Sequence, residues 1–173
     1  MTVSFTCADA LSGTTACPAA QALGEGADQS VSGTVTDKAG NSASASVTGT
    51  NVDKTAPTIS ASRTPLGNAD GWNNTDVPVS FTCGDALSGA ASCSGPVTLT
   101  AEGANQSATG SVTDLAGNTA SATLGGVNID KTAPVLTTSQ NPGPNAFGWN
   151  NGPVTVSFNC SDGLSGLAGP CPG

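Results

Sequence analysis

Short stretches of alternating apolar and polar residues dominate the chain between residues 53 and 129. In one of them Val77, Val79, Phe81 and Cys83 alternate with Pro, Ser and Thr. A period of two is typical of half-buried antiparallel strands. The pattern recurs at Val97, Leu99 and Ala101, at Gly110, Val112 and Asp114, and at Ala120, Ala122 and Leu124, and a further strand-sized segment is Pro57–Arg63. Because no part of the chain has helical periodicity and turn residues separate these stretches, the sequence predicts an all-β fold.

Several short motifs return at a nearly constant interval. The stretch Asp53–Pro57, DKTAP, recurs at Asp130–Pro134, 77 positions later. The other recurring motifs are GWNN at Gly71–Asn74 and Gly148–Asn151, VSFTC at Val3–Cys7 and Val79–Cys83 with VSFNC at Val156–Cys160, and Asp-x-Ala-Gly-Asn at Asp37–Asn41 and Asp114–Asn118. Self-similarity at a fixed period indicates a repeat architecture. We therefore expect one complete unit at 53–129, the C-terminal part of a unit at 1–52 and the N-terminal part of another at 130–173.

The number of strands suggests how each unit is built. Seven or so short strands in about 77 residues predict a small two-sheet sandwich, with units joined end to end through very short linkers such as Val127–Asp130. A β-solenoid is the alternative, although its repeats are normally much shorter. No secretory signal follows Met1, so we expect the chain to be a piece of a longer array.

These motifs resemble a known family. DKTAP, GWNN, VSFTC with DALSG, EGANQS and DLAGN, in this fixed order, are similar to the immunoglobulin-like repeats of large bacterial secreted and cell-surface proteins. The resemblance covers nearly the whole chain. It implies tandem immunoglobulin-like modules that form a stalk or an adhesin, an extracellular or cell-surface location, and a structural or adhesive role without naming a ligand.

Composition limits the core and the partners. Only 36% of the residues are hydrophobic and 3% aromatic, so any core is thin. Four basic residues against twelve acidic ones give a net charge of -8, which argues against nucleic acid or an anionic membrane as partner. No apolar run approaches the roughly 20 residues that span a bilayer, so we expect no membrane insertion. Cations are the expected counterpart.

The six cysteines form one pair in each copy of the repeat. The pairs are Cys7 with Cys17, Cys83 with Cys93, and Cys160 with Cys171. An even number at nearly equal spacing, in a chain that we expect to be extracellular, predicts three local disulfides. Reduced thiols and a metal or redox site are the alternatives, but zinc sites normally require histidine or Cys-x-x-Cys and the chain has neither.

Most of the acidic residues also recur, which suggests a positional role. Asp53 opens the whole unit, and in an immunoglobulin-like strand order the loop with Asp85 and the turn at Asp114 lie at the same pole. Calcium accepts six to eight oxygen ligands and would relieve the repulsion between such carboxylates. The predicted calcium ligands are Asp53, Asp85 and Asp114 with Asn51 and Asn118, and at the next junction Asp130, Asp162 and Asn128 with Glu102. The alternative is that these carboxylates only cap their own turns.

The sequence argues against an enzyme. Without histidine, Ser-His-Asp and Cys-His catalysis are excluded, and paired acids would need an aromatic-lined sugar cleft to act as a glycosidase. Trp72 and Trp149 follow glycine in turn-rich loops, where packing in the core or at a junction is the favoured role. Carbohydrate binding at these tryptophans is the alternative function. The expected partners are neighbouring modules or further copies of the chain, which would join into a fibre by strand addition, and surface glycans.

Overall fold

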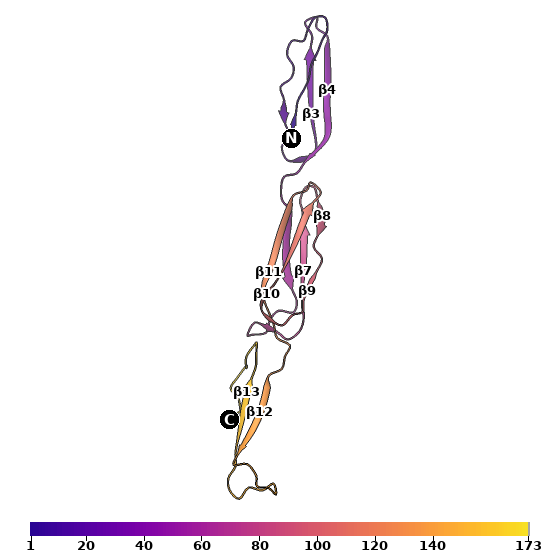
Figure 1. Cartoon of the computed structure of the whole chain (residues 1–173). Helices are drawn as coiled ribbons and strands as arrows, with labels where there is room; N and C mark the ends of the chain where they lie inside the picture. The colour runs from indigo at the N-terminus through magenta and orange to yellow at the C-terminus, as the bar shows by residue number, and fades with distance from the viewer. Residues whose placement is uncertain (173) are drawn as a thin grey trace. The chain divides into compact units, whose positions relative to one another are not determined.

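The computed structural model describes residues 1–172, which form thirteen strands and no helix (Figure 1). The predicted all-β class is therefore confirmed. Gly173, the last residue of the third predicted segment, lies outside the described residues. No helix that is long and apolar enough to cross a bilayer occurs in the described part of the chain.

The strands vary in length from 2 to 12 residues. They are β1 (Thr2–Val3), β2 (Gln21–Ala22), β3 (Gly26–Thr36), β4 (Ser42–Val52), β5 (Thr58–Arg63), β6 (Trp72–Asn73), β7 (Val77–Gly84), β8 (Ala90–Cys93), β9 (Val97–Leu99), β10 (Gly103–Asp114), β11 (Thr119–Ile129), β12 (Val135–Asn141) and β13 (Thr155–Ser161). Seven of these, β5 to β11, fall in residues 53–129. The longest strands are β3, β4, β10 and β11. The sequence missed β6 and β8, and Ala101 lies beyond the end of β9.

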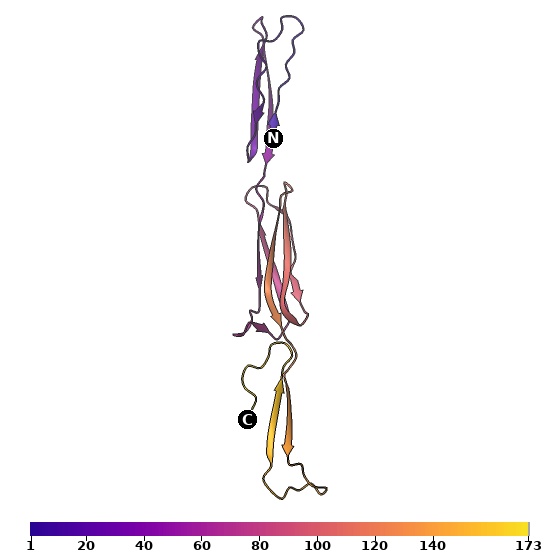
Figure 2. The same ribbon diagram turned by 60° about the vertical axis from the view of Figure 1, so that its left-hand side comes forward.

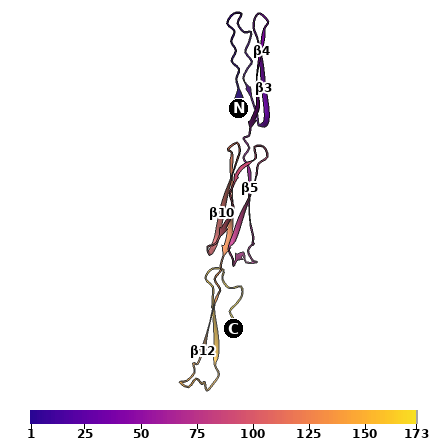
Figure 3. The same cartoon turned by 90° about the vertical axis from the view of Figure 1, so that its right-hand side faces the viewer.

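The strands pair into five sheets. A four-stranded sheet has the order β6-β11-β10-β8 and a three-stranded sheet the order β5-β7-β9. Three further sheets have two strands each, β1 with β2, β3 with β4 and β12 with β13. The β3–β4 hairpin is seen in Figure 2, and β5 and β10 are labelled in Figure 3.

The chain divides into two compact units that share strands. One unit contains residues 1–60, 82–94 and 110–122, and the other contains residues 61–81, 95–109 and 123–173. Strands β5, β7, β10 and β11 pass from one unit into the other. This division does not follow the predicted boundaries at residues 53 and 130. Each unit instead contains several separate segments of the chain, because the long strands extend through both units. The module at 53–129 therefore stays a prediction.

Strand β10 shows the predicted alternation, since Ala108, Gly110, Val112 and Asp114 are buried. Strand β11 changes phase: Leu124 is half-buried, but Val127 and Ile129 are the fully buried residues that follow. Between them Gly126 has φ +69°, a left-handed conformation that glycine adopts without a Cβ clash. This local change of backbone conformation places Val127 and Ile129, rather than Gly126, on the buried face of the strand.

Each unit has a small apolar core. In the first, Val3, Leu23 and Val31 are buried together, with Phe5 packed against them. A Cβ on Gly33 would lie 2.7 Å from the Phe5 ring, so glycine lets the ring cover β3.

In the second unit, Val77 of β7 packs with Val127 and Ile129 of β11, and all three are 0% exposed. Leu99 and Leu124 are partly buried against this cluster. The cluster therefore joins the three-stranded sheet to the four-stranded sheet. With so few residues, each of these cores depends on every large side chain in it.

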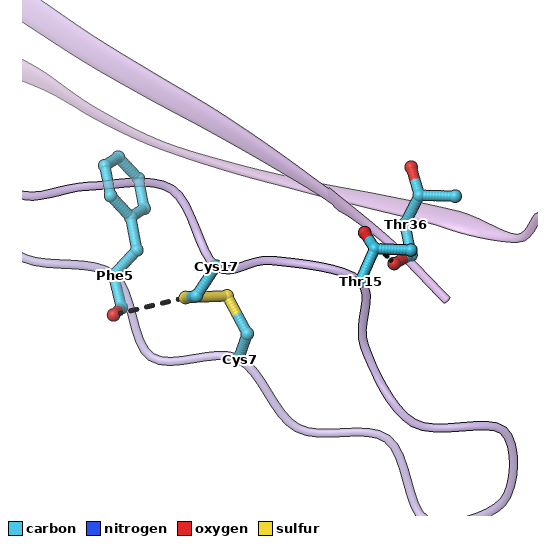
Figure 4. The surroundings of a disulfide bond; sticks show 5 residues. All are labelled: Phe5, Cys7, Thr15, Cys17 and Thr36. Carbon is cyan, nitrogen blue, oxygen red and sulfur yellow. Dashed lines mark hydrogen bonds between the residues drawn. A yellow bond between two sulfur atoms is a disulfide. The ribbon is translucent and has the colours of Figure 1, made fainter. Parts of the chain in front are cut away.

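Three disulfides form, with the predicted pairing. Cys7–Cys17, Cys83–Cys93 and Cys160–Cys171 have S–S distances of 2.05, 2.04 and 2.02 Å. Figure 4 shows the first, which lies next to the Thr15 hydroxyl that donates to the Thr36 carbonyl oxygen at 2.8 Å. Because a disulfide sulfur carries no hydrogen, the 3.4 Å approach of Cys17 Sγ to the Phe5 carbonyl oxygen is a van der Waals contact. Three disulfides indicate folding in an oxidising environment.

Candidate metal centre

The loop after β7 is organised by a carboxylate. Asp85 Oδ1 accepts hydrogen bonds from the backbone N–H groups of Leu87 and Gly89, at 3.1 and 2.7 Å. An aspartate that accepts hydrogen bonds from the backbone N–H groups that follow it forms an Asx turn. Such a turn orders a loop whose residues belong to no strand. The same two contacts occur around Asp9 and Asp162.

Asp114 is the last residue of β10 and is only 2% exposed. Its Oδ1 accepts from the backbone N–H of Asn118 at 2.7 Å, and its Oδ2 accepts from the Asn118 side-chain amide at 2.8 Å. Gly117 has φ +93° in the turn between them, which a side chain would disfavour. The Asp-x-Ala-Gly-Asn motif therefore encodes a tight hairpin turn between β10 and β11, closed by its own first and last residues.

Asp53 follows β4 and bonds both its own segment and the DALSG loop. Its Oδ1 accepts from the backbone N–H of Thr55 at 3.0 Å, and its Oδ2 accepts from the backbone N–H of Ser88, also at 3.0 Å. Ser88 was not among the predicted site residues. The sequence feature that could have identified Ser88 is the recurrence of Leu-Ser-Gly at residues 11–13, 87–89 and 164–166.

The structure brings these three carboxylates together. Asp53, Asp85 and Asp114 each place a carboxylate oxygen so that all three atoms lie within 4.8 Å of one another. Within residues 1–172 the one ion pair joins Lys131 to Asp76, so no Lys or Arg balances the cluster. Closely spaced carboxylates favour proton uptake or a bound cation. Their oxygens are the donors that a hard divalent cation prefers, and water or backbone oxygens would complete its shell.

The predicted amide ligands have other partners. Asn51 Oδ1 accepts from the backbone N–H of Asp28 at 2.8 Å, and Asp28 has φ 50° at an irregularity of the β3–β4 ladder. Asn118 directs its side-chain N–H groups, rather than its oxygen, toward Asp114 Oδ2 and the Asp53 carbonyl oxygen. The ligand set that the geometry supports is therefore the three carboxylates.

A surface pocket of about 360 Å³ adjoins this cluster. Asp53 and Ser88 line it together with the apolar side chains Leu87 and Leu115. Leu115 is 72% exposed, so the pocket combines a solvent-exposed apolar side chain with the Asp53 carboxylate.

The segment after Asp53 is held by a second carboxylate. Glu25 Oε1 accepts from the backbone N–H of Lys54 at 2.8 Å and from the Thr55 hydroxyl at 2.6 Å. Glu102 makes the corresponding bonds to Lys131 and Thr132. Glu102 was predicted as a calcium ligand, and the structure places it in this clamp. The constant separation of 29 residues between the glutamate and the lysine was the sequence signal.

The second predicted acidic set is only partly assembled. Asp130, 8% exposed, accepts from the backbone N–H groups of Thr132 and Ser165, and the Ser165 hydroxyl donates to Asp162 Oδ1 at 3.3 Å. Asn128 Oδ1 instead accepts from the backbone N–H of Asn105 at 2.7 Å. Asn105 has φ 56°, a left-handed conformation, so Asn128 satisfies the N–H of a residue whose backbone departs from the extended strand.

The two tryptophans differ in exposure. Trp72 is half-buried in β6, where it pairs with Asn128 of β11. Trp149 is 75% exposed beside a turn in which Asn145 Oδ1 accepts from its backbone N–H at 3.0 Å.

Hydrogen bonds to the charged form lower the pKa of several carboxyl groups. The Ser88 side chain is the main cause for the pKa of Asp53, the Thr55 hydroxyl for that of Glu25, and the Ser165 side chain for that of Asp130. The pKa values of Asp9 and Asp37 are lowered chiefly by the Gly13 backbone N–H and the Asn41 side chain. Each of these bonds therefore favours the ionised carboxylate in the folded state.

We expect the metal-free protein to lose stability in acid. A carboxyl group whose pKa is lower in the folded state stabilises the fold above its unfolded pKa, and this contribution is lost as the pH falls through the folded value. The ordinary values are 4.5 for Glu25 and 3.8 for Asp53, so the melting temperature should begin to fall near pH 4.5 and continue downward. Thermal melts between about pH 6 and about pH 3 in the presence of a chelator measure this.

Glu25→Gln is the control for the acid effect, because it keeps an acceptor oxygen but cannot ionise. Its melting temperature should depend less steeply on pH than that of the parent. Equal slopes would show that ionisation of Glu25 does not contribute to the acid dependence of the stability.

Fold and site together define a disulfide-bonded all-β protein with a cluster of three carboxylates near the β10–β11 turn. Comparison with known proteins finds no family model, no curated protein and no solved structure that matches this chain.

Proposed function

We propose that this chain is part of a non-enzymatic extracellular repeat array, a stalk, adhesin or filament segment, and that calcium stiffens its junctions. Each complete module is an immunoglobulin-like β-sandwich, and residues 53–129 form one. The calcium ligands at the first junction are Asp53, Asp85 and Asp114. In this arrangement the protein acts by keeping modules in a fixed relation rather than by catalysis.

The observation that carries the proposal is the pair of carboxylates, Glu25 and Asp53, that fix the linker at Asp53–Thr55 by hydrogen bonds. Glu25, from the segment before the linker, holds the backbone N–H of Lys54 at 2.8 Å. Asp53 reaches forward to the backbone N–H of Ser88 at 3.0 Å. A linker that is bonded on both sides favours a fixed junction, and a cation on Asp53, Asp85 and Asp114 would add a bond between the linker and two loops of the following segment.

Repetition of these contacts supports a modular array. The Asp53 bonds to Thr55 and Ser88 have counterparts 77 positions later, from Asp130 to Thr132 and Ser165. The core of the second unit joins residues of two sheets, as expected for a sandwich.

Neighbouring modules, in the same chain or in another copy, are the partners that we propose. Val79 in β7 is 0% exposed, whereas Val156 at the corresponding position of β13 is 51% exposed. Val77 is likewise 0% exposed and Val154 is 37% exposed. These apolar residues are buried in one repeat and exposed in the next. Such an exposed apolar face is expected where further strands pack against it.

Calcium titration tests the proposal. Binding should occur with a dissociation constant of the order of 0.1–1 mM, as in extracellular modules. A concentration of ten times this constant should stabilise the fold by about 1.4 kcal/mol per site. Isothermal titration calorimetry and thermal melts of the metal-free protein measure the two effects.

Asp114→Asn is the matched variant for the first junction, because its Oδ1 can still accept from the Asn118 N–H while the charge is lost. It should remove the binding event assigned to this junction. Absence of any binding heat and of any melting shift at millimolar calcium would contradict the calcium proposal.

A further inference from the structure

Asn73, in the GWNN motif, carries a buried oxygen without a partner. The residue is 4% exposed, and its Oδ1 is the one buried side-chain polar atom within residues 1–172 that has no hydrogen bond. Its Nδ2 donates to the Asn128 carbonyl oxygen at 3.1 Å, which fixes the orientation of the amide. A buried acceptor without a partner costs about 1–3 kcal/mol, so its retention needs a reason such as a bound ion.

This oxygen belongs to a residue that adjoins Asp130. The backbone carbonyl of Asn73 accepts from the backbone N–H of Asp130 at 2.9 Å. Asn73, Asp130 and Ser165 line the same pocket of about 200 Å³, together with Trp72, Asn68 and Asn74. A polar pocket of this size has room for an ion with its water ligands.

Asp162 supplies a second carboxylate to this region. The backbone N–H of Ser165 donates to Asp130 Oδ2 at 2.8 Å, and the Ser165 hydroxyl donates to Asp162 Oδ1 at 3.3 Å. One serine therefore connects the two acids. Lys131, the nearest basic residue in sequence, has its Nζ on Asp76 and on the Thr100 carbonyl oxygen. Two carboxylates and one neutral amide oxygen are thus present, and no basic side chain pairs with either acid.

We propose that Asn73 Oδ1, Asp130 and Asp162 form a second divalent-cation site, for which Ca²⁺ is the natural occupant. The inference rests on the proposed calcium-stiffened junction and adds a ligand to it, because the GWNN loop of one repeat supplies a neutral oxygen to the acids of the next. Two carboxylates, an amide oxygen and water give the all-oxygen, flexible shell that Ca²⁺ takes. The role of Asn73, the first Asn of the GWNN motif, is then to bind the cation.

Terbium luminescence tests this site separately from the one at Asp53. Tb³⁺ replaces Ca²⁺ on oxygen ligands and emits when a nearby excited tryptophan transfers energy to it. Trp72 lines the pocket of Asn73 and Asp130, whereas no tryptophan lines the pocket at Asp53. The full chain should therefore show Tb³⁺ emission on tryptophan excitation, and Ca²⁺ should displace it. Trp72→Phe should abolish the emission.

Two variants remove ligands, and two serve as controls. Asn73→Ala and Asp162→Asn should each weaken the sensitised Tb³⁺ binding at least about tenfold. Asp162→Asn keeps an oxygen for the Leu164 and Gly166 N–H groups, so its loop should still fold. Asn151→Ala, at the exposed last position of the second GWNN motif, and Asp114→Asn should leave the emission unchanged.

The outcomes separate this inference from the calcium proposal at Asp53. Unchanged emission in Asn73→Ala, or no sensitised emission in the parent chain, overturns the second site. Loss of emission in Asn73→Ala and Asp162→Asn supports it, provided that Asn151→Ala is unaffected. The calcium heats assigned to Asp53, Asp85 and Asp114 should persist in Asn73→Ala and disappear in Asp114→Asn. Failure of that second pattern counts against the first site only.

Discussion

Removal of the Cys83–Cys93 disulfide should destabilise residues 53–129 by roughly 2.5–3 kcal/mol, the chain-entropy value for a loop of about eleven residues. The effect is large relative to the 5–15 kcal/mol that typically separates folded and unfolded domains. The clip ties the end of β7 to β8 around the Asp85 loop, so its loss should also loosen the Asp85 carboxylate. The double variant Cys83→Ala/Cys93→Ala avoids a free thiol.

Urea unfolding followed by Trp72 fluorescence in a Trp149→Phe background measures this loss. The matched control is Cys160→Ala/Cys171→Ala, which removes the corresponding disulfide between β13 and Cys171. If residues 53–129 unfold as one module, this control should leave the Trp72 transition unchanged. Equal stability of the Cys83→Ala/Cys93→Ala variant and the parent would show that the core needs no covalent support.

Ile129→Ala should cost about 2–5 kcal/mol, because it removes buried methyl groups and leaves a cavity. Ile129 is 0% exposed and packs with only Val77 and Val127 in the buried cluster. A core of this size offers few side chains that can move into the space. Ile129→Val should cost only about 0.5–1.5 kcal/mol.

Val97→Ala is the control for the core substitution, since Val97 is 40% exposed in β9. Its cost should stay below that of Ile129→Ala in the same urea experiment. A loss as large in Val97→Ala as in Ile129→Ala would mean that surface strand propensity, rather than burial, determines the stability of this sheet.

The alternation of apolar residues was sufficient to predict the strands that have one buried face. Val77 and Val79 in β7, and Val112 in β10, are buried at the positions that the period of two gives. The same rule cannot find β6 or β8, because two to four residues are too few to show a period. It also cannot anticipate the phase change at Gly126, where a left-handed glycine turns Val127 and Ile129 inward.

The candidate site divides in the same way between local and distant information. The sequence by itself determined the disulfide pairs and the Asx turns, because residues ten or four positions apart in a small loop have few other arrangements. It also marked Asp53, Asp85 and Asp114 as recurring acids.

Only the tertiary structure decided which side-chain oxygens are free to bind a cation. Asn51 and Asn128 satisfy the backbone N–H groups of Asp28 and Asn105, which have positive φ. Glu102 clamps a linker, and Asn73 keeps a buried side-chain oxygen without a partner. These assignments depend on which backbone groups the strand ladders leave unpaired, and that is settled only when distant strands pair.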